Sequence, residues 1–297
     1  MKLGFFVNNV AAELSGYTTT RLAQTTINRG GQAWYISADD FIYGADGVIY
    51  AHGTAAPKGN YKTPDAYLHA LLGKNAVKQR VTVDDLDVLM LRSDPSTETG
   101  DRIWAQTAGI TFARVAKRRG VVVVNDPDGL LKAMNKMYFQ HFPEEVRPKT
   151  LISRNREDIK HFISEMGGNA VIKPLQGSGG SGVFMAKVDD RSNINQMIDT
   201  LVRNGYLIAQ EYLTAAAEGD TRLFMMNGKP LKYKGKYAAF RRLRSGDDMR
   251  SNIHAGGKKA KADITESHLR LAEIVRRKLV QDGMFLGGLD IVGDKLM

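Results

Sequence analysis

The 297-residue sequence contains no cysteine. Disulfide bonds and thiolate metal sites are therefore excluded, which is typical of proteins of the reducing cytoplasm, where we expect this protein to act. No apolar run approaches the roughly 20 residues that span a bilayer. The apolar start of the chain is also too short for a signal peptide and lacks a small-residue cleavage site. We therefore expect no membrane partner.

Catalytic motifs built on histidine are also missing. The six histidines show no metal-ligand spacing, and neither a Ser-His-Asp nor a Cys-His arrangement is evident. The bulk composition, with 43% hydrophobic and 25% charged residues, is that of a globular protein. A chain of this length predicts two or three packed subdomains.

What the sequence has in excess is positive charge, with a formal net charge of +10. Such a charge favours anionic partners: phosphates, carboxylates or nucleic acid. Five arginines crowd a predicted strand and the adjoining loop: Arg222, Arg241, Arg242, Arg244 and Arg250. Their fork-like donors suit carboxylates and phosphates, although a solvated basic face is the simpler interpretation. Tyr233, Tyr237 and Phe240 precede the cluster, so nucleic-acid stacking stays open from charge and composition alone.

The first third of the chain alternates strand and helix patterns, which predicts an open α/β sheet. The expected strands are 3–7, 33–37, 48–51, 87–92 and 121–124, and the expected helices are 18–28 and 102–119. The four valines 121–124 indicate a central parallel strand. Any site should lie at the carboxyl ends of these strands.

A boundary is expected near residues 126–128, and the pattern then changes. Helices are expected at 130–142, 156–166, 192–203 and 265–281, and strands at 149–153, 170–173, 183–188, 207–211 and 285–292. Asn227-Gly228 predicts a hairpin joining strands 222–226 and 230–233. The polar stretch 241–261 is expected to be loop.

A glycine-rich segment follows the strand that ends at Lys173. Gly177, Gly179, Gly180 and Gly182 would let the backbone approach a polyphosphate closely. The order of residues differs from both the P-loop and the dinucleotide-binding fingerprint. A flexible hairpin loop is the alternative.

Two further segments are candidates for ligand contacts. The strand ending at Gln210, Glu211, Tyr212 and Leu213 could form a domain hinge that reads an adenine edge, or be an ordinary strand end. Asp290 lies within an apolar strand, where a carboxylate needs a partner. Magnesium is one such partner.

In this order, these pieces resemble the ATP-grasp superfamily, specifically prokaryotic glutathione synthetase. The segments that carry the resemblance are 91–95, 124–127, 135–136, 172–180, 209–213, 218–222, 250–257 and 288–294. The resemblance implies an ATP-grasp fold, α/β in class and α+β overall. Residues 1–127 would form an N-terminal open α/β domain, 128–208 an antiparallel lid with two helices, and 209–297 a C-terminal subdomain.

The resemblance also implies an ATP-dependent carboxylate–amine ligase that works through an acylphosphate. The substrates would be γ-glutamylcysteine and glycine, the cofactors ATP and Mg²⁺ with Mn²⁺ as an alternative, and the protein would form a homo-oligomer without a nucleic-acid partner. An ATP-grasp ligase for another carboxylate–amine pair and a nucleotide-binding module without catalysis are the competing hypotheses.

Site roles follow from the resemblance where the motifs match. Lys136 and Lys173 would neutralise ATP phosphates under the loop of Gly177, Gly179 and Gly180. Gln210, Glu211, Tyr212 and Leu213 would hold adenine, and Asp220 the ribose. Arg222 and Arg242 would act at the reacting phosphate, and Asp290 would bind metal. The substrate residues would be Arg92, Asp94, Arg250, Asn252, Gly256 and Gly257.

The last segment departs from the family pattern. A Glu-x-Asn motif that completes the metal site follows the Asp290 strand in the family, and it does not occur before Met297. Asp294 corresponds to the family's turn acid. Either residues 1–297 are a truncated form, which we favour, or the protein has lost metal-assisted catalysis. We expect residues 1–297 to bind ATP weakly and to turn over slowly or not at all.

Overall fold

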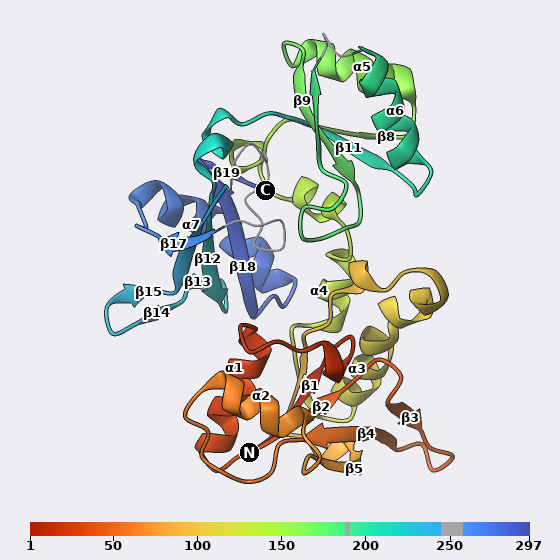
Figure 1. The fold of residues 1–297 in the computed structure, drawn as a ribbon, viewed down its shortest axis with the longest axis vertical. Coiled ribbons are helices and arrows are strands. Elements are labelled where there is room, and N and C mark those ends of the chain that lie inside the picture. Colours follow the sequence, from red (N-terminus) through yellow and green to blue (C-terminus); the bar gives the residue numbers. More distant parts are fainter. Residues whose placement is uncertain (188–190, 245–257) are drawn as a thin grey trace. The chain divides into compact units, whose positions relative to one another are not determined.

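The computed structural model describes residues 1–187, 191–244 and 258–297. The chain divides into two compact units, Met1–Leu131 and Lys132–Met297 (Figure 1). Each unit is considered by itself below. In the described part of the chain, no helix is both long and apolar enough to cross a membrane.

The first unit is built on a seven-stranded mixed sheet with the order β3-β4-β2-β1-β6-β7, and β5 pairs with β4. Its strands are β1 (Lys2–Phe6), β2 (Gln32–Ile36), β3 (Phe41–Tyr43), β4 (Ile49–Ala55), β5 (Val77–Thr82), β6 (Val88–Leu91) and β7 (Val122–Val124). Strand β1 pairs in parallel with β2 and β6, and β6 in parallel with β7. The predicted open α/β unit is confirmed. The predicted strand 48–51 lies in β4, but its antiparallel pairing and the strands β3 and β5 were not predicted.

The valine strand is parallel, as predicted, but it is not central. It ends the sheet order as β7, and Val122 is 57% exposed. A run of valines fits a strand buried on both faces, but it fits an edge strand as well because β-branched residues favour extended backbone in either place.

Helices α1 (Thr18–Asn28), α2 (Pro64–Leu72) and α3 (Ala108–Arg118) belong to the first unit. Helix α1 has the predicted bounds. The expected helix 102–119 is wrong in its first part, because residues Gly100–Gln106 form a 3₁₀ helix, η4. Ile103 and Trp104 are at least half exposed there, so no apolar stripe holds the segment to the core.

The second unit contains two main sheets. The first has the order β10-β9-β11-β8, all antiparallel, and is covered by two helices. Its elements are β8 (Thr150–Ser153), α5 (Arg156–Glu165), β9 (Asn169–Pro174), β10 (Phe184–Lys187), α6 (Arg191–Val202) and β11 (Leu207–Glu211). Ile159, Ile163 and Ile198 from the helices share one core with Ile172 of β9. The glycine-rich segment connects β9 to β10.

The second sheet of this unit has the order β17-β16-β12-β18-β19, with β13 paired to β12 and a separate ribbon β14-β15. The elements are β12 (Asp220–Met226), β13 (Lys229–Pro230), β14 (Lys232–Tyr233), β15 (Lys236–Tyr237), β16 (Ala239–Leu243), β17 (Lys258–Lys261), α7 (Glu266–Gln281), β18 (Leu286–Val292) and β19 (Lys295–Leu296). The predicted hairpin is confirmed, with positive φ of 48° at Asn227 and 72° at Gly228.

Two predictions for the second half are wrong. The stretch expected as loop begins with β16 and ends with β17, which pair with each other, while residues 245–257 lie outside the described residues. The expected helix 130–142 is divided into α4 (Pro127–Lys132) and the 3₁₀ helix η5 (Lys136–His141). The side chain of Asn135 accepts a hydrogen bond from Met137 N and so begins a new helix within the predicted one.

A buried carboxylate, Asp282, joins separate segments of the second unit. It accepts hydrogen bonds from Lys132 Nζ at 2.9 Å, from the Tyr138 hydroxyl at 2.8 Å and from Lys278 Nζ at 2.7 Å. Burial alone would raise the pKa of Asp282, but these donors outweigh it and lower the pKa to about 2. Because the folded pKa is depressed, this stabilisation is complete above the ordinary carboxyl pKa near 3.8 and is lost as the pH falls towards 2.

We expect Asp282→Asn to reduce the free energy of unfolding by roughly 1–3 kcal/mol at neutral pH, because two lysines lose their counter-charge. Urea unfolding at neutral and acidic pH measures the effect, and the variant should lose part of the acid sensitivity. Asp263→Asn is the control, since Asp263 is 89% exposed in its ion pair with Lys261. Equal losses in the two variants would contradict the role given to Asp282.

Candidate functional site

Two arginines and two aspartates meet on three neighbouring strands of the second unit. Arg222 on β12 lies directly opposite Asp290 on β18, and Asp220 on β12 lies opposite Arg242 on β16. Residues 220 and 222 share one face of β12, since side chains alternate along a strand. The register of three antiparallel strands therefore brings together four charged side chains, of which the most distant pair, Asp220 and Asp290, is 70 residues apart in the sequence.

The contacts within this cross-strand cluster are short and directional. Arg222 donates from Nε and Nη2 to the two carboxylate oxygens of Asp290, each at 2.6 Å. Arg242 donates from Nε to Asp220 at 2.9 Å and from Nη2 to Asp290 at 2.8 Å. Burial would raise the pKa of Asp290, but the two guanidinium groups outweigh it and hold that pKa below its usual value. Asp290 is thus ionised at neutral pH.

Gly219 fixes the start of β12 next to this cluster. Its φ is +92°, and a Cβ built on it would lie 2.0 Å from the carbonyl oxygen of Arg242. Any other residue would push the neighbouring strand β16 away. Glycine at this position lets the backbone bring Asp220 within reach of the Arg242 side chain.

The basic cluster of the sequence is thus partly neutralised within the protein. Arg222 and Arg242 have carboxylate partners, and Arg241 projects to an exposed ion pair with Glu218. The sequence analysis named both the arginines and the aspartates but did not predict that they pair with each other, because the strand register that pairs them is not visible in the local sequence pattern. Arg250, Asn252, Gly256 and Gly257 lie outside the described residues.

Lys173 on β9 is the second element of the site. It is only 8% exposed, and its Nζ donates to the side-chain oxygen of Gln210 on β11 at 2.8 Å. Gln210 in turn donates from Nε2 to the Thr150 hydroxyl at 3.0 Å. Burial, with a further contribution from the nearby charge of Lys136, lowers the pKa of Lys173 to about 8. The positive charge is therefore costly in the free protein, and a bound anion would relieve that cost.

Lys136 lies against the start of the glycine-rich segment. Its Nζ donates to the carbonyl oxygens of Pro174 at 3.1 Å and Gly177 at 2.8 Å. Its backbone N–H donates to the carbonyl oxygen of Leu175 at 3.0 Å. Gly177 has a positive φ of 151°, and a Cβ there would lie 3.3 Å from the Pro174 ring. Gly179 and Gly180 follow in the same connection, both with positive φ. Lys136 thus contacts the segment 174–177, which directly follows Lys173 in the sequence.

Gln210 was predicted as an adenine contact, but in this structure its side chain is the acceptor for Lys173. We expect Gln210→Met to lower the pKa of Lys173 further, because the ammonium group loses this acceptor. The pH dependence of acetylation of the Lys173 peptide, followed by mass spectrometry, measures that pKa, with the exposed Lys258 as the reference within the same digest. An unchanged or raised pKa in the variant would show that Gln210 does not support the charge.

Of the other predicted hinge residues, Glu211 is the last residue of β11. The backbone N–H of Glu211 donates to Lys149 O at 3.0 Å, and its carboxylate accepts from Lys149 N at 2.9 Å. Tyr212 and Leu213 follow outside regular structure and lead into the 3₁₀ helix η7 (Thr214–Glu218). The side chain of Glu211 is therefore used to fix the strand end, while the next two residues belong to a connecting segment.

Arg92 and Asp94 lie in the first unit, at the carboxyl end of β6. The backbone N–H of Arg92 donates to Phe6 O at 2.8 Å. Asn8 holds the following turn, because its side chain accepts from Asp94 N at 2.7 Å and donates to Asp94 O at 2.9 Å. The Asp94 carboxylate accepts from Ser96 N and so caps the turn. Asn8 was missed by the sequence interpretation, since only the pairing of β1 with β6 places it here.

A divalent metal is implied by the resemblance, with Asp290 as its ligand. Asp290 and Asp220 supply hard carboxylate oxygens, and Mg²⁺ usually takes one or two of these together with phosphate oxygens. Among the described residues, no group of three or more acidic or histidine side chains forms a complete metal cage. The donor chemistry therefore fits a metal that binds together with a polyphosphate. Asp290 already accepts hydrogen bonds from Arg222 and Arg242, so its oxygens would be shared between these arginines and the metal.

Comparisons with known proteins cover both units. Residues 1–130 match the family described as "Prokaryotic glutathione synthetase, N-terminal domain", and residues 135–297 match "Prokaryotic glutathione synthetase, ATP-grasp domain". The glutathione synthetase of Gloeobacter violaceus is 30% identical over 302 aligned residues, which cover 99% of this chain and 86% of the relative. The glutathione synthetase of Escherichia coli is 31% identical, over 90% of this chain and 79% of the relative.

Solved structures share the fold at lower identity. A D-cycloserine synthetase has a TM-score of 0.63 at 14% sequence identity, and the match covers 99% of this chain and 90% of the synthetase chain. An ATP-grasp protein of Sphaerobacter thermophilus has a TM-score of 0.58 at 15% sequence identity, and the match covers 100% of this chain and 89% of that protein's chain. The predicted ATP-grasp fold is confirmed by this likeness. Together with the match over both units, it shows that the chain belongs to the prokaryotic glutathione synthetase family.

Proposed function

We propose that this protein is an ATP-dependent ligase that joins γ-glutamylcysteine to glycine through an acylphosphate. Family membership over both units supports the reaction class. The observation that carries it to particular residues is the cross-strand cluster of Arg222, Arg242, Asp220 and Asp290, four charges fixed on rigid strands. Phosphoryl transfer needs charge neutralisation and alignment more than a covalent nucleophile. The cluster contributes alignment through arginine donors held in fixed directions, and Lys136 and Lys173 contribute positive charge.

In the first step, a carboxylate oxygen of the peptide attacks the γ-phosphorus of ATP, and ADP leaves. Lys136 and Lys173 neutralise phosphate oxygens beneath the backbone of the loop of Gly177, Gly179 and Gly180. Tyr212 and Leu213 offer backbone groups to adenine. Asp290 holds a divalent cation, Mg²⁺ or Mn²⁺, which supplies further positive charge to the phosphates when it is bound.

In the second step, the amine attacks the acyl carbon and inorganic phosphate leaves. The fork of Arg222 and the buried Arg242 donate to the oxygens that gain charge in both steps. Asp220 was expected as a ribose contact, but its carboxylate is bound to Arg242, so we propose that it acts first by orienting that arginine. Arg92, Asp94, Arg250, Asn252, Gly256 and Gly257 are the candidate substrate residues on the family resemblance alone.

The test is product formation by the full-length protein with ATP, a divalent metal, γ-glutamylcysteine and a panel of amines. Stoichiometric phosphate release and a product with the mass of glutathione support the proposal. No phosphate release with γ-glutamylcysteine and glycine counts against these substrates, and ATP binding without release from any pair indicates a nucleotide-binding module.

We further expect a cytoplasmic homo-oligomer that binds neither nucleic acid nor membranes. Light scattering on the purified protein gives the number of subunits. Steep, salt-dependent binding to DNA or RNA would contradict the expectation, because the net charge of +10 would then serve a polyanion rather than the nucleotide.

A further inference from the structure

The sheet that contains β12 has two faces of different character. Leu223 and Met225 on β12 and Leu289 on β18 point to one side, where they share a core with residues of helix α7. Asp220 and Arg222 alternate with these residues along β12 and therefore point to the other side. The cross-strand cluster thus lies on the face of the sheet that is turned away from α7.

This charged face continues beyond Arg242 onto the edge strand β17. Lys259 lies directly opposite Arg242 in the antiparallel pair of β16 and β17, and Lys261 lies opposite Phe240. Side chains that are directly opposite each other share a face, and their Cβ atoms are about 5 Å apart. The register therefore places Lys259 next to Arg242 on the face that carries the cluster.

An aromatic ring holds the amine of Lys259 over this face. Nζ of Lys259 lies 5.3 Å from the centre of the Phe240 ring, which is a cation–π contact. Phe240 in turn lies directly opposite Arg222, so the ring stands between β17 and that arginine. The contact directs the amine from the sheet edge towards the cluster.

The charge of Lys259 is not neutralised within the strands of this face. Arg222 and Arg242 have Asp290 and Asp220 as partners, and Lys261 pairs with an exposed aspartate at 3.4 Å. Among the described residues, no carboxylate pairs with Lys259, which is exposed. A ligand carboxylate that approaches the cluster therefore meets an unneutralised cation at this position.

We propose that Lys259 binds the carboxylate of the acceptor amine, so that the protein selects an amino acid rather than a simple amine. The inference rests on the proposed function, in which the acylphosphate forms beside Arg222 and Arg242. It deepens that function by naming a specificity-determining residue for the second substrate.

The chemistry of the second step brings a carboxylate to this place. The amine attacks the acyl carbon beside the two arginines, and in glycine a single carbon separates the amine from its carboxylate. That carboxylate must therefore lie close to the arginines, within reach of a neighbouring strand. In γ-glutamylcysteine, one carboxylate has become the acylphosphate, and the other is at the far end of the dipeptide. The carboxylate nearest the reacting carbon is thus that of the acceptor.

The experiment compares the full-length wild type with Lys259→Gln, which keeps a polar end but removes the charge. The acceptors are glycine and glycinamide, which has the same amine but no carboxylate. We expect the KM for glycine to rise about 10-fold in the variant, because a charge-assisted contact is lost. The KM values for glycinamide, ATP and γ-glutamylcysteine should stay at their wild-type values.

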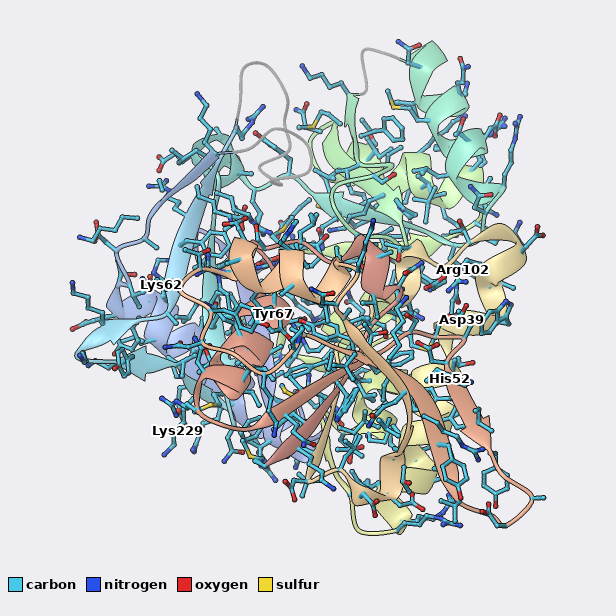
Figure 2. All side chains as sticks on the ribbon, turned by 60° about the horizontal axis from the view of Figure 1, so that its bottom comes forward. Asp39, His52, Lys62, Tyr67, Arg102 and Lys229 are labelled. Carbon is cyan, nitrogen blue, oxygen red and sulfur yellow. The ribbon has the colours of Figure 1, made fainter. Side chains whose placement is uncertain are left out.

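Two further lysines serve as controls. Lys258 precedes Lys259 on the same edge strand, is exposed and points to the opposite face. Lys229, labelled in Figure 2, is exposed and lies opposite Met226 at the far end of β12. Lys258→Gln and Lys229→Gln each remove one positive charge from the same unit and should keep the wild-type KM for glycine. Equal rises in all three variants would show a general effect of net charge and overturn the inference.

Ligation by Lys259→Gln with an unchanged KM for glycine would overturn the role of Lys259 and leave the proposed function intact. A rise confined to the KM for γ-glutamylcysteine or ATP would do the same, since it assigns the contact to another substrate. Absence of ligation in the wild type would instead contradict the proposed function. If Lys259→Gln does not fold, the wild type alone decides: equal KM values for glycine and glycinamide would overturn the inference.

Discussion

Replacing Asp290 by asparagine is expected to lower kcat/KM by about 10²–10³-fold, a loss of the size found when one charge-stabilising group is removed from an active site. Asparagine keeps the volume and one acceptor oxygen but removes the negative charge. Arg222 would then lose its two-point ion pair, which spans 2.6 Å at each contact. Among the described residues, Arg242 would keep Asp220 as its charged partner.

The two roles of Asp290 can be separated by the metal dependence. If it holds the divalent cation, the metal concentration that gives half-maximal rate rises in Asp290→Asn. If it only orients arginines, that concentration stays constant and Arg222→Lys reproduces the loss, because lysine cannot form the two-point contact. Asp294→Asn is the control, since Asp294 lies just beyond the same strand and is 77% exposed. A nearly active Asp290→Asn would remove this residue from the site.

Lys173→Met is the second variant with a large expected effect. Methionine preserves the buried stem and removes the amine, so ATP turnover should fall about 10²–10³-fold with a higher KM for ATP. A retained KM for ATP would show that Lys173 does not contact the nucleotide. The exposed Lys258 provides the control, since Lys258→Met removes the same amine from a surface position.

The pH dependence of stability should also differ between the wild type and Lys173→Met. The pKa of Lys173 is lowered to about 8 in the folded protein, against 10.5 for the free side chain. The unfolded chain therefore binds more protons between these values, and wild-type stability gains a rising contribution as the pH increases from 8 to 10.5. Lys173→Met lacks this contribution. Urea unfolding across that range measures it, and identical slopes in both proteins would contradict the buried charge.

Much of the fold could be predicted because the local signals were strong. Helix α1 ends at Asn28, directly before Arg29 and Gly30, and β11 was predicted with its observed bounds. The hairpin at Asn227-Gly228 has the backbone that this pair favours. In contrast, α2 and strands β3, β5 and β19 were not predicted, since short elements depend on packing against neighbours more than on their own pattern.

The site was predicted as a set of residues rather than as an arrangement. Lys173 and Asp290 were chosen from motifs, but their partners Gln210 and Arg222 come from strands distant in sequence. Register decides these contacts: Gln210 lies opposite Thr150 on β8, and Arg222 lies opposite Asp290.

The most direct measurement follows an oxygen isotope label placed in the carboxylate of γ-glutamylcysteine. An acylphosphate requires that one carboxylate oxygen bonds to phosphorus in the first step and leaves with phosphate in the second. With the full-length protein, ATP, a divalent metal and glycine, every inorganic phosphate released with amide formation should carry a labelled oxygen from the peptide. Amide formation with unlabelled phosphate would contradict the account.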